Sequence, residues 1–101
     1  MRLVLCNCPP DHADRLARAL VERRLAACVN AIPAVVSTYR WEGEVCVDKE
    51  TTLLIKTRSD RLDELTEVLV ELHPYDVPEV LALPVAGGSN AYLAWLHDQT
   101  S

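Results

Sequence analysis

The stretch AVVSTYRWEGEVCVDKETTLLIKT, residues 34–57, decides the fold because it reads as two long β-strands joined by a tight turn. β-Branched and aromatic residues dominate it, as is typical of a pleated sheet. Gly43 supplies the backbone freedom that the predicted turn at residues 41–44 needs. An arm of about a dozen residues at ~3.3 Å each spans roughly 40 Å. A compact chain of this length has a radius of gyration of only ~13 Å, so the end of the hairpin should reach beyond its own core.

The far end of this hairpin carries two aromatic side chains, Tyr39 and Trp41. An isolated two-stranded ribbon is only marginally stable in water. Aromatic side chains with a polar tip are favoured in protein interfaces, and Trp95, near the end of the chain, is of the same kind. We therefore predict that other copies of the chain cover the ribbon, and that Tyr39, Trp41 and Trp95 lie in the interface.

Composition indicates one globular domain that spans residues 1–101. Hydrophobic residues make up 50% and charged residues 25% of the chain, which argues against disorder. The formal net charge of −5 and the lack of a basic cluster argue against a nucleic-acid partner. No apolar run approaches the ~20 residues of a membrane span, and Pro9-Pro10 follows the start too soon for a signal peptide. We expect a soluble cytoplasmic protein with no membrane partner.

The remaining elements alternate around the hairpin. Apolar, strand-like runs stand at residues 3–8, 26–32 and 80–85. Apolar residues at helical spacing follow three predicted N-caps, which are Asp11, Ser59 or Asp60, and Ser89. Pro33 should break the strand that precedes the hairpin. The order βαββαβ plus a terminal helix predicts an α/β sandwich of the ferredoxin-like type, with a long central hairpin.

Several uncommon residues recur at fixed offsets along the chain. They are RLAACVN at 24–30, Ser37, Tyr39, Trp41 and Gly43, Lys56-Thr57, His73-Pro74-Tyr75, Pro78-Glu79, Tyr92-Leu93 and Trp95-Leu96. In these residues, over nearly its whole length, the chain resembles the CutA family of divalent-cation tolerance proteins. The resemblance implies a ferredoxin-like domain assembled as a tight homotrimer, similar in architecture to PII signalling proteins.

Cys6 and Cys8 are the first candidates for metal binding. The period of two in a strand places both thiols on one face, where two soft ligands could hold copper(I) or zinc. The alternative is a pair of buried, reduced thiols, and the lack of a second cysteine pair with zinc-site spacing favours it. The resemblance implies a copper ligand at Cys6, whereas Cys8 lies outside the family pattern.

His73 and Glu79 flank the bend that follows the second helix. His73 could cap the helix C-terminus or ligate a metal. The resemblance implies a His-His-Pro run for copper here, but this chain reads Leu72-His73-Pro74, with one histidine fewer. Glu79 could accept backbone donors, pair with Lys56 or line a pocket between subunits. Two other carboxylates, Asp48 and Glu50, are expected on a solvated strand face.

Two functions from different classes follow. The first is a trimeric protein of metal-ion tolerance that binds copper or a similar divalent cation through Cys6 and His73, with Cys8 and Glu79 as weaker candidates. The second is a PII-like sensor that binds a small ligand in clefts between subunits, near residues 73–79 and the neighbouring hairpin. A mainly structural trimer that docks another protein is a further alternative. We expect no enzyme and no organic cofactor, because no nucleophile, base and orienting group, and no phosphate-binding loop, stand in the sequence.

Overall fold

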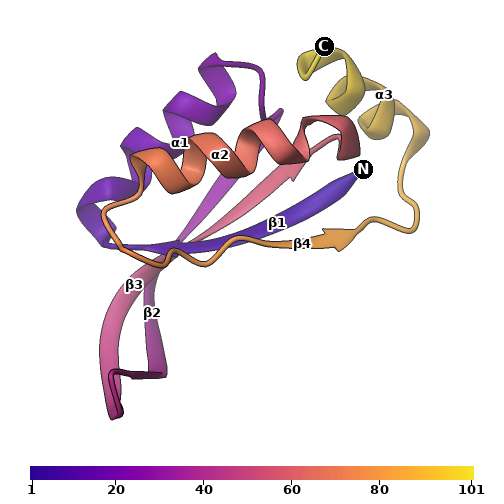
Figure 1. Cartoon of the computed structure of the whole chain (residues 1–101). Coiled ribbons are helices and arrows are strands. Elements are labelled where there is room, and N and C mark those ends of the chain that lie inside the picture. The colour runs from indigo at the N-terminus through magenta and orange to yellow at the C-terminus, as the bar shows by residue number, and fades with distance from the viewer.

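In the computed structural model, which describes residues 1–101, two helices cover one face of a four-stranded sheet (Figure 1). The strands are β1 (Arg2–Cys8), β2 (Cys28–Trp41), β3 (Glu44–Thr57) and β4 (Leu81–Pro84). The helices are α1 (Ala13–Glu22), α2 (Leu62–Leu72) and α3 (Asn90–Gln99), with 3-10 turns η1 (Pro10–His12) and η2 (Ser59–Arg61) before the first two. The spatial order is β2-β3-β1-β4 and each neighbouring pair is antiparallel, which confirms the predicted ferredoxin-like βαββαβ fold.

The starts of α1 and α2 differ from the predicted ones. Asp11, Ser59 and Asp60 lie inside the 3-10 turns η1 and η2, and neither α-helix has a side-chain capping hydrogen bond. The prediction of these three residues as N-caps was wrong, because each helix is entered through an extra turn that satisfies part of the backbone. At α3 the prediction is confirmed, since the Ser89 hydroxyl accepts a hydrogen bond from the Tyr92 amide at 3.4 Å.

The core lies between the helices and the sheet. Its fully buried members come from β1, β3 and both covering helices, and include Val4, Cys6, Cys8, Leu16, Leu20, Leu53, Ile55, Leu65 and Leu69. The helical members recur every three or four residues, so each helix buries one stripe. All four cysteines are free, and two of them belong to this core. No helix is long and apolar enough to cross a bilayer.

β2 and β3 form one continuous ribbon that leaves the sheet and extends past the core (Figure 1). The two strands pair from Cys28 opposite Lys56 to Trp41 opposite Glu44. The turn uses a positive φ at Glu42 (49°) as well as at Gly43 (81°), a combination typical of two-residue hairpin loops. The molecule measures 45 × 24 × 21 Å, and its length confirms that the ribbon reaches beyond the core.

Pro33 does not break β2, contrary to the prediction. The pairing slips between Ile32, which lies opposite Thr52, and Val35, which lies opposite Glu50. Pro33 and Ala34 therefore form a bulge, and Ala34 takes a positive φ of 59°. Proline, which lacks an amide donor, is tolerated at edge strands and bulges, and Pro33 lies at a bulge in the edge strand β2. Bulges bend and twist a strand, and the ribbon turns away from the sheet in this region (Figure 1).

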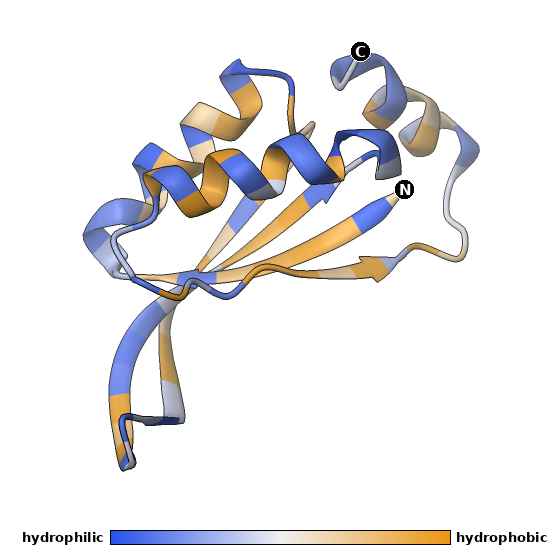
Figure 2. Cartoon of the chain, viewed as in Figure 1, coloured by the Kyte–Doolittle hydropathy of each residue, from blue (hydrophilic) through white to orange (hydrophobic).

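The sheet face opposite the helices is uncovered. The register places Leu83 and Leu81 of β4 beside Leu3 and Leu5 of β1, and both β4 leucines are exposed. Figure 2 shows the hydrophobic colour along these two strands and again near the tip of the ribbon. A lone chain thus presents a continuous apolar surface to water, a feature that marks interaction sites in soluble proteins.

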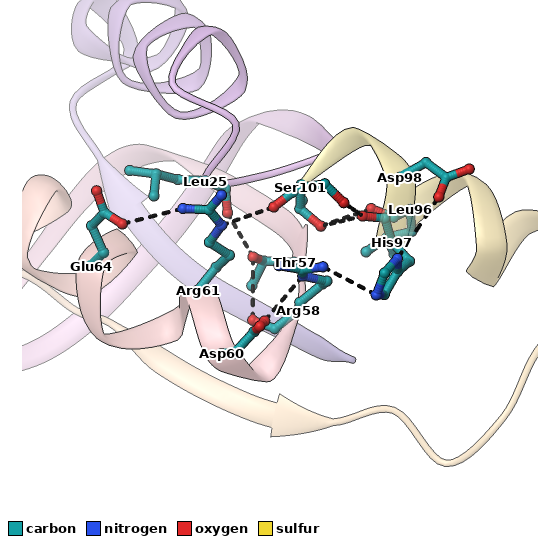
Figure 3. Close-up of polar contacts among 11 residues, drawn as sticks. Leu25, Thr57, Arg58, Asp60, Arg61, Glu64, Leu96, His97, Asp98 and Ser101 are labelled. Atoms are coloured by element: carbon teal, nitrogen blue, oxygen red, sulfur yellow. Dashed lines mark hydrogen bonds and ion pairs between the residues drawn. The ribbon is translucent and has the colours of Figure 1, made fainter.

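A polar network holds the C-terminal helix α3 against η2 (Figure 3). Arg58 Nη1 lies 3.1 Å from His97 Nε2, and Arg61 Nε donates a hydrogen bond to the Thr100 carbonyl at 2.8 Å. A guanidinium only donates, so His97 Nε2 accepts and is unprotonated in this arrangement. Arg58 also forms an ion pair with Asp60 at 3.0 Å. These contacts fix the end of the chain that carries Tyr92 and Trp95.

Candidate functional site

The bend at residues 73–79 lies beside the ribbon and encloses a cleft of about 680 Å³ with it. Asn7 of β1 forms part of its floor. The ribbon contributes Ser37, Thr38, Tyr39, Trp41 and Glu50, and the bend contributes Pro74, Tyr75, Asp76, Val77 and Glu79. A volume of this order suits a small organic molecule. The prediction placed a ligand cleft between subunits, near this bend and the hairpin; a single chain forms a cleft at that place.

The cleft is acidic. Glu50, Asp76 and Glu79 line it, and none of its lining residues is Lys, Arg or His. Burial, and secondly the charge of Glu50, raise the pKa of the Glu79 carboxyl above its ordinary value. Within one chain the site therefore concentrates negative charge, and no positive side chain among its lining residues balances that charge.

Glu50 is buried, although its position predicted a solvated strand face. Only 6% of the residue is exposed, and the Tyr75 hydroxyl donates a hydrogen bond of 2.7 Å to its Oε2. The bend after α2 folds over this part of β3, and that long-range contact buries the carboxylate. The prediction for Glu50 was wrong because strand alternation gives the face of a residue but does not show what packs on that face.

Both tyrosines of the cleft are held through their hydroxyls. The Tyr39 hydroxyl donates to Asp48, and this hydrogen bond is the main reason that the pKa of Tyr39 rises to about 12. Burial and the hydrogen bond to Glu50 raise the pKa of Tyr75. Both phenols therefore stay neutral at physiological pH, and each ring is tethered to a carboxylate at the edge of the cleft.

His73 fastens the bend to β1. It is buried, its Nε2 lies 2.8 Å from the Asn7 carbonyl oxygen, and its Nδ1 accepts a hydrogen bond from the Tyr75 amide at 3.2 Å. Since a carbonyl only accepts, Nε2 carries the proton. Its ring also packs against that of Tyr75, with centroids 4.7 Å apart. Both ring nitrogens are thus engaged, and His73 would have to give up one hydrogen bond to ligate a metal.

Cys6 and Cys8 point into the core rather than into the cleft. Burial, and secondly Cys8, raise the pKa of the Cys6 thiol to about 12, and burial also raises the pKa of Cys8. Thiolates, not thiols, bind metals, so both residues are held in the less reactive form. Within one chain, no three or more His, Cys, Asp or Glu side chains are grouped to hold a metal ion. A metal site at Cys6 and His73, with Cys8 and Glu79 as weaker members, stays a prediction.

Glu79 lines the cleft and forms no ion pair with Lys56, which was one expectation for it. The Lys56 ammonium instead contacts the Asn30 side chain and lies 3.9 Å from Cys28 Sγ. Tyr39, Trp41 and Trp95, the predicted interface aromatics, are all partly exposed in the single chain. Tyr39 and Trp41 also form the ribbon wall of the cleft.

Comparison with known sequences identifies relatives of the same size and longer ones. The chain is 50% identical over 99 residues to "Divalent-cation tolerance protein CutA" of Thermus thermophilus, covering 97% of this chain and 96% of that protein. It is 47% identical over 95 residues to "Protein CutA" of Homo sapiens, covering 93% of this chain and 53% of that protein. The chain thus spans about half the length of this human relative and of the chloroplastic one from Arabidopsis thaliana.

Solved structures share the whole architecture. The Cut A1 divalent cation tolerance protein of Thermus thermophilus superposes with a TM-score of 0.96 at 48% identity, over 100% of both chains. The "PII-like protein CutA" of Nostoc sp. PCC 7120 gives 0.94 at 39% identity, over 100% of this chain and 98% of that one. A protein of Archaeoglobus fulgidus described as periplasmic gives 0.95 at 31% identity, over 100% of both chains.

The family model for "CutA1 divalent ion tolerance protein" matches residues 2–99. That match covers every helix and strand described above, from β1 to α3. Together with relatives at about 50% identity over almost the full length, it establishes that the chain belongs to the CutA1 divalent ion tolerance family.

Proposed function

We propose that this protein is a non-enzymatic, PII-like sensor in the response to metal ions, which binds a small ligand in the cleft between the ribbon and the bend. The cleft itself carries this proposal: its volume of about 680 Å³ far exceeds a bare metal ion, and polar and aromatic side chains line it. The name of the Nostoc neighbour, a PII-like protein, supports the same class. A metal-tolerance phenotype would then follow from a ligand-dependent signal.

The proposal includes assembly as a homotrimer. Val45 and Val47 of the ribbon are 65% and 61% exposed, and the apolar sheet face formed by β1 and β4 is open as well. Other copies would bury both surfaces, together with Tyr39, Trp41 and Trp95. Because the ribbon forms one wall of the cleft, each cleft would then lie between subunits.

Light scattering during gel filtration of the dilute, folded protein tests the assembly. The expected mass is three times that of the 11.3 kDa chain. Val47→Asp should release monomers, because it would bury an unpaired charge in the interface. Val70→Asp, the same change at an exposed position of α2, is the matched control and should remain trimeric. A folded wild-type monomer would contradict the assembly and any site between subunits.

A thermal-shift screen tests the sensor function. The trimer is heated with nucleotides, small metabolites and divalent metal salts in separate wells. A bound ligand stabilises the folded state by mass action, so a true ligand raises Tm in a concentration-dependent way. If only metal salts raise Tm, the sensor function is contradicted.

Direct binding of copper or a similar divalent cation is the second candidate function. The family name favours it, and ligands from a neighbouring subunit could complete a site that one chain leaves incomplete. Titration of copper and zinc into tag-free protein should then show saturable binding. The double variant Cys6→Ala/His73→Ala should abolish it, and unchanged binding would exclude these two ligands.

We also propose a cytoplasmic location. Four free cysteines suit a reducing compartment, where disulfides are rare. Cell fractionation with an antibody to the native protein tests the location, and recovery outside the cytoplasmic fraction would contradict it.

A further inference from the structure

We propose that the cleft between the ribbon and the bend takes a small organic cation, a protonated or quaternary amine. The inference rests on the proposed function and names the chemical class of its ligand. Three features of the cleft carry it: negative charge that no basic side chain of the same chain balances, a largely buried carboxylate with one accessible oxygen, and three aromatic rings along its walls.

The charge of the cleft selects a cation. Glu50, Asp76 and Glu79 line it, and no basic side chain does. None of the three carboxylates forms an ion pair with Lys, Arg or His elsewhere in the chain. These three carboxylates would repel an anionic ligand such as a nucleotide, whereas a cation would relieve the repulsion among them.

Glu50 supplies an anchoring group. The residue is 94% enclosed, given its exposed fraction of 6%, and it lines the cleft. The Tyr75 hydroxyl donates to Oε2, while Oε1 accepts no hydrogen bond from the protein. Oε1 itself is not a buried atom, so it can accept a hydrogen bond from an N–H donor or contact a cationic group in the cleft.

The aromatic residues distinguish an organic cation from a metal ion. Tyr39 and Trp41 on the ribbon and Tyr75 on the bend line the cleft, and all three are partly exposed in the single chain. In the proposed trimer Tyr39 and Trp41 also lie at the subunit interface, so their rings would line a cleft between subunits. Hydrogen bonds from both tyrosine hydroxyls to carboxylates hold their rings in place. Ammonium groups are attracted to the faces of such rings, as in the aromatic cages that recognise choline and methylated lysine.

A bare metal ion suits this arrangement less well. Hard divalent cations need about six oxygen ligands in one tight shell, and soft ones need grouped Cys or His ligands. The carboxylates of the cleft are not grouped in this way within the chain. An organic ammonium ion, whose positive charge is spread over a larger apolar group, is a better match for carboxylates that lie apart and for aromatic rings.

Isothermal titration of the assembled wild-type protein with choline chloride tests the proposal. The neutral isostere 3,3-dimethylbutan-1-ol has the same shape without the charge, and sodium chloride at equal ionic strength serves as the blank. Choline should bind saturably, and roughly tenfold or more tightly than the isostere. Binding of both compounds with equal affinity, or of neither, would overturn the inference.

Two variants test the position of the site. Glu79→Gln and Asp76→Asn each remove one negative charge and keep the side-chain size, and each should weaken choline binding several-fold. Asp76 is exposed and without a hydrogen bond, so its variant should fold even if the Glu79 variant does not. Glu67→Gln, on the exposed face of α2, is the control with the same charge change and should bind as the wild type does. Equal weakening in all three variants would indicate non-specific attraction and would overturn the site.

The binding measurements also distinguish a failure of this inference from a failure of the proposed sensor function. If a neutral or anionic metabolite binds and the cleft variants abolish its binding, the sensor function stands and the organic-cation class is wrong. If no organic compound binds and copper or zinc does, both are wrong and metal binding replaces them.

Discussion

The ribbon formed by β2 and β3 is packed at its base and bare in its far half. Leu53 and Ile55 are fully buried, whereas Val45 and Val47, on the same face of the same strand, are among the most exposed apolar residues of the chain. In both halves β2 and β3 pair in one antiparallel ladder, and both halves contain similar numbers of β-branched and aliphatic residues. Both halves therefore form strands, and they differ in burial because the helices cover only the base of the ribbon.

The boundary between the halves coincides with the bulge and with the cleft. Pro33 and Ala34 lie opposite the segment in which β3 changes from exposed to buried, beginning with Glu50 and Thr51. At the same level the bend after α2 contacts the ribbon through Tyr75 and Glu50. The cleft thus occupies the place where the ribbon leaves its own core.

The largest expected effect comes from Leu53→Ala in the base. Removing a fully buried leucine side chain should lower the free energy of unfolding by about 2–5 kcal/mol, because a cavity remains in the core. Urea denaturation followed by circular dichroism measures it. Val47→Ala, on the same face in the far half, is the control and should cost less than about 0.5 kcal/mol once the protein is diluted to monomers. Equal losses would contradict the division of the ribbon.

A smaller effect is expected at the tip of the far half. Gly43 has a φ of 81°, so Gly43→Ala should cost about 1–2 kcal/mol, the penalty for a side chain in the left-handed region. The control is Gly87→Ala, where an added Cβ meets no atom within 4 Å and φ is not positive. Thermal unfolding of both variants compares them. If Gly43→Ala costs no more than the control, the turn is not ordered and the far half frays on its own.

The same contrast explains what sequence could predict. Alternation in residues 45–55 identified one face of β3, and the order of elements identified the ferredoxin-like fold. Both features depend on local periodicity. The burial of Glu50 and the hydrogen bonds of His73 depend on contacts between distant segments, since β1, the ribbon and the bend meet only after folding. Pro33 was predicted to break a strand because sequence does not show that β2 is an edge strand with a bulge.

The cleft residues were partly predictable for the same reason. Glu79 belongs to a recognisable run around the bend, so the resemblance identified it, together with His73, which fastens the bend to β1. Glu50 and Asp76 carry no such signal. The residues around Glu50 in the sequence, Lys49 and Thr51, are those of an ordinary alternating strand. Only the folded structure shows that Tyr75 packs beside Glu50 and donates a hydrogen bond to it.

The smallest expected effect is the pH dependence of stability at the boundary, tested with Glu79→Gln. Burial and Glu50 raise the folded-state pKa of Glu79 above the unfolded value of ~4.3. Below that unfolded value the carboxyl is protonated in both states. As pH rises through the folded-state pKa, the wild type loses stability, because the unfolded chain ionises more readily. Glutamine does not titrate, so the variant's gain in Tm over the wild type should grow as pH rises above the unfolded value of ~4.3, and should level off once pH exceeds the folded-state pKa of Glu79.

Thermal unfolding across this pH range, with Glu67→Gln as a control that should show no trend, measures the difference. A gain that shrinks as pH rises would mean that the folded protein favours ionised Glu79, contrary to the raised pKa. Choline at saturating concentration should itself reduce the gain at pH 7, since a bound cation stabilises the ionised carboxylate that the variant lacks. The boundary of the ribbon would then be a site where burial and the charge of Glu50 disfavour ionised Glu79, and where a bound cation favours it.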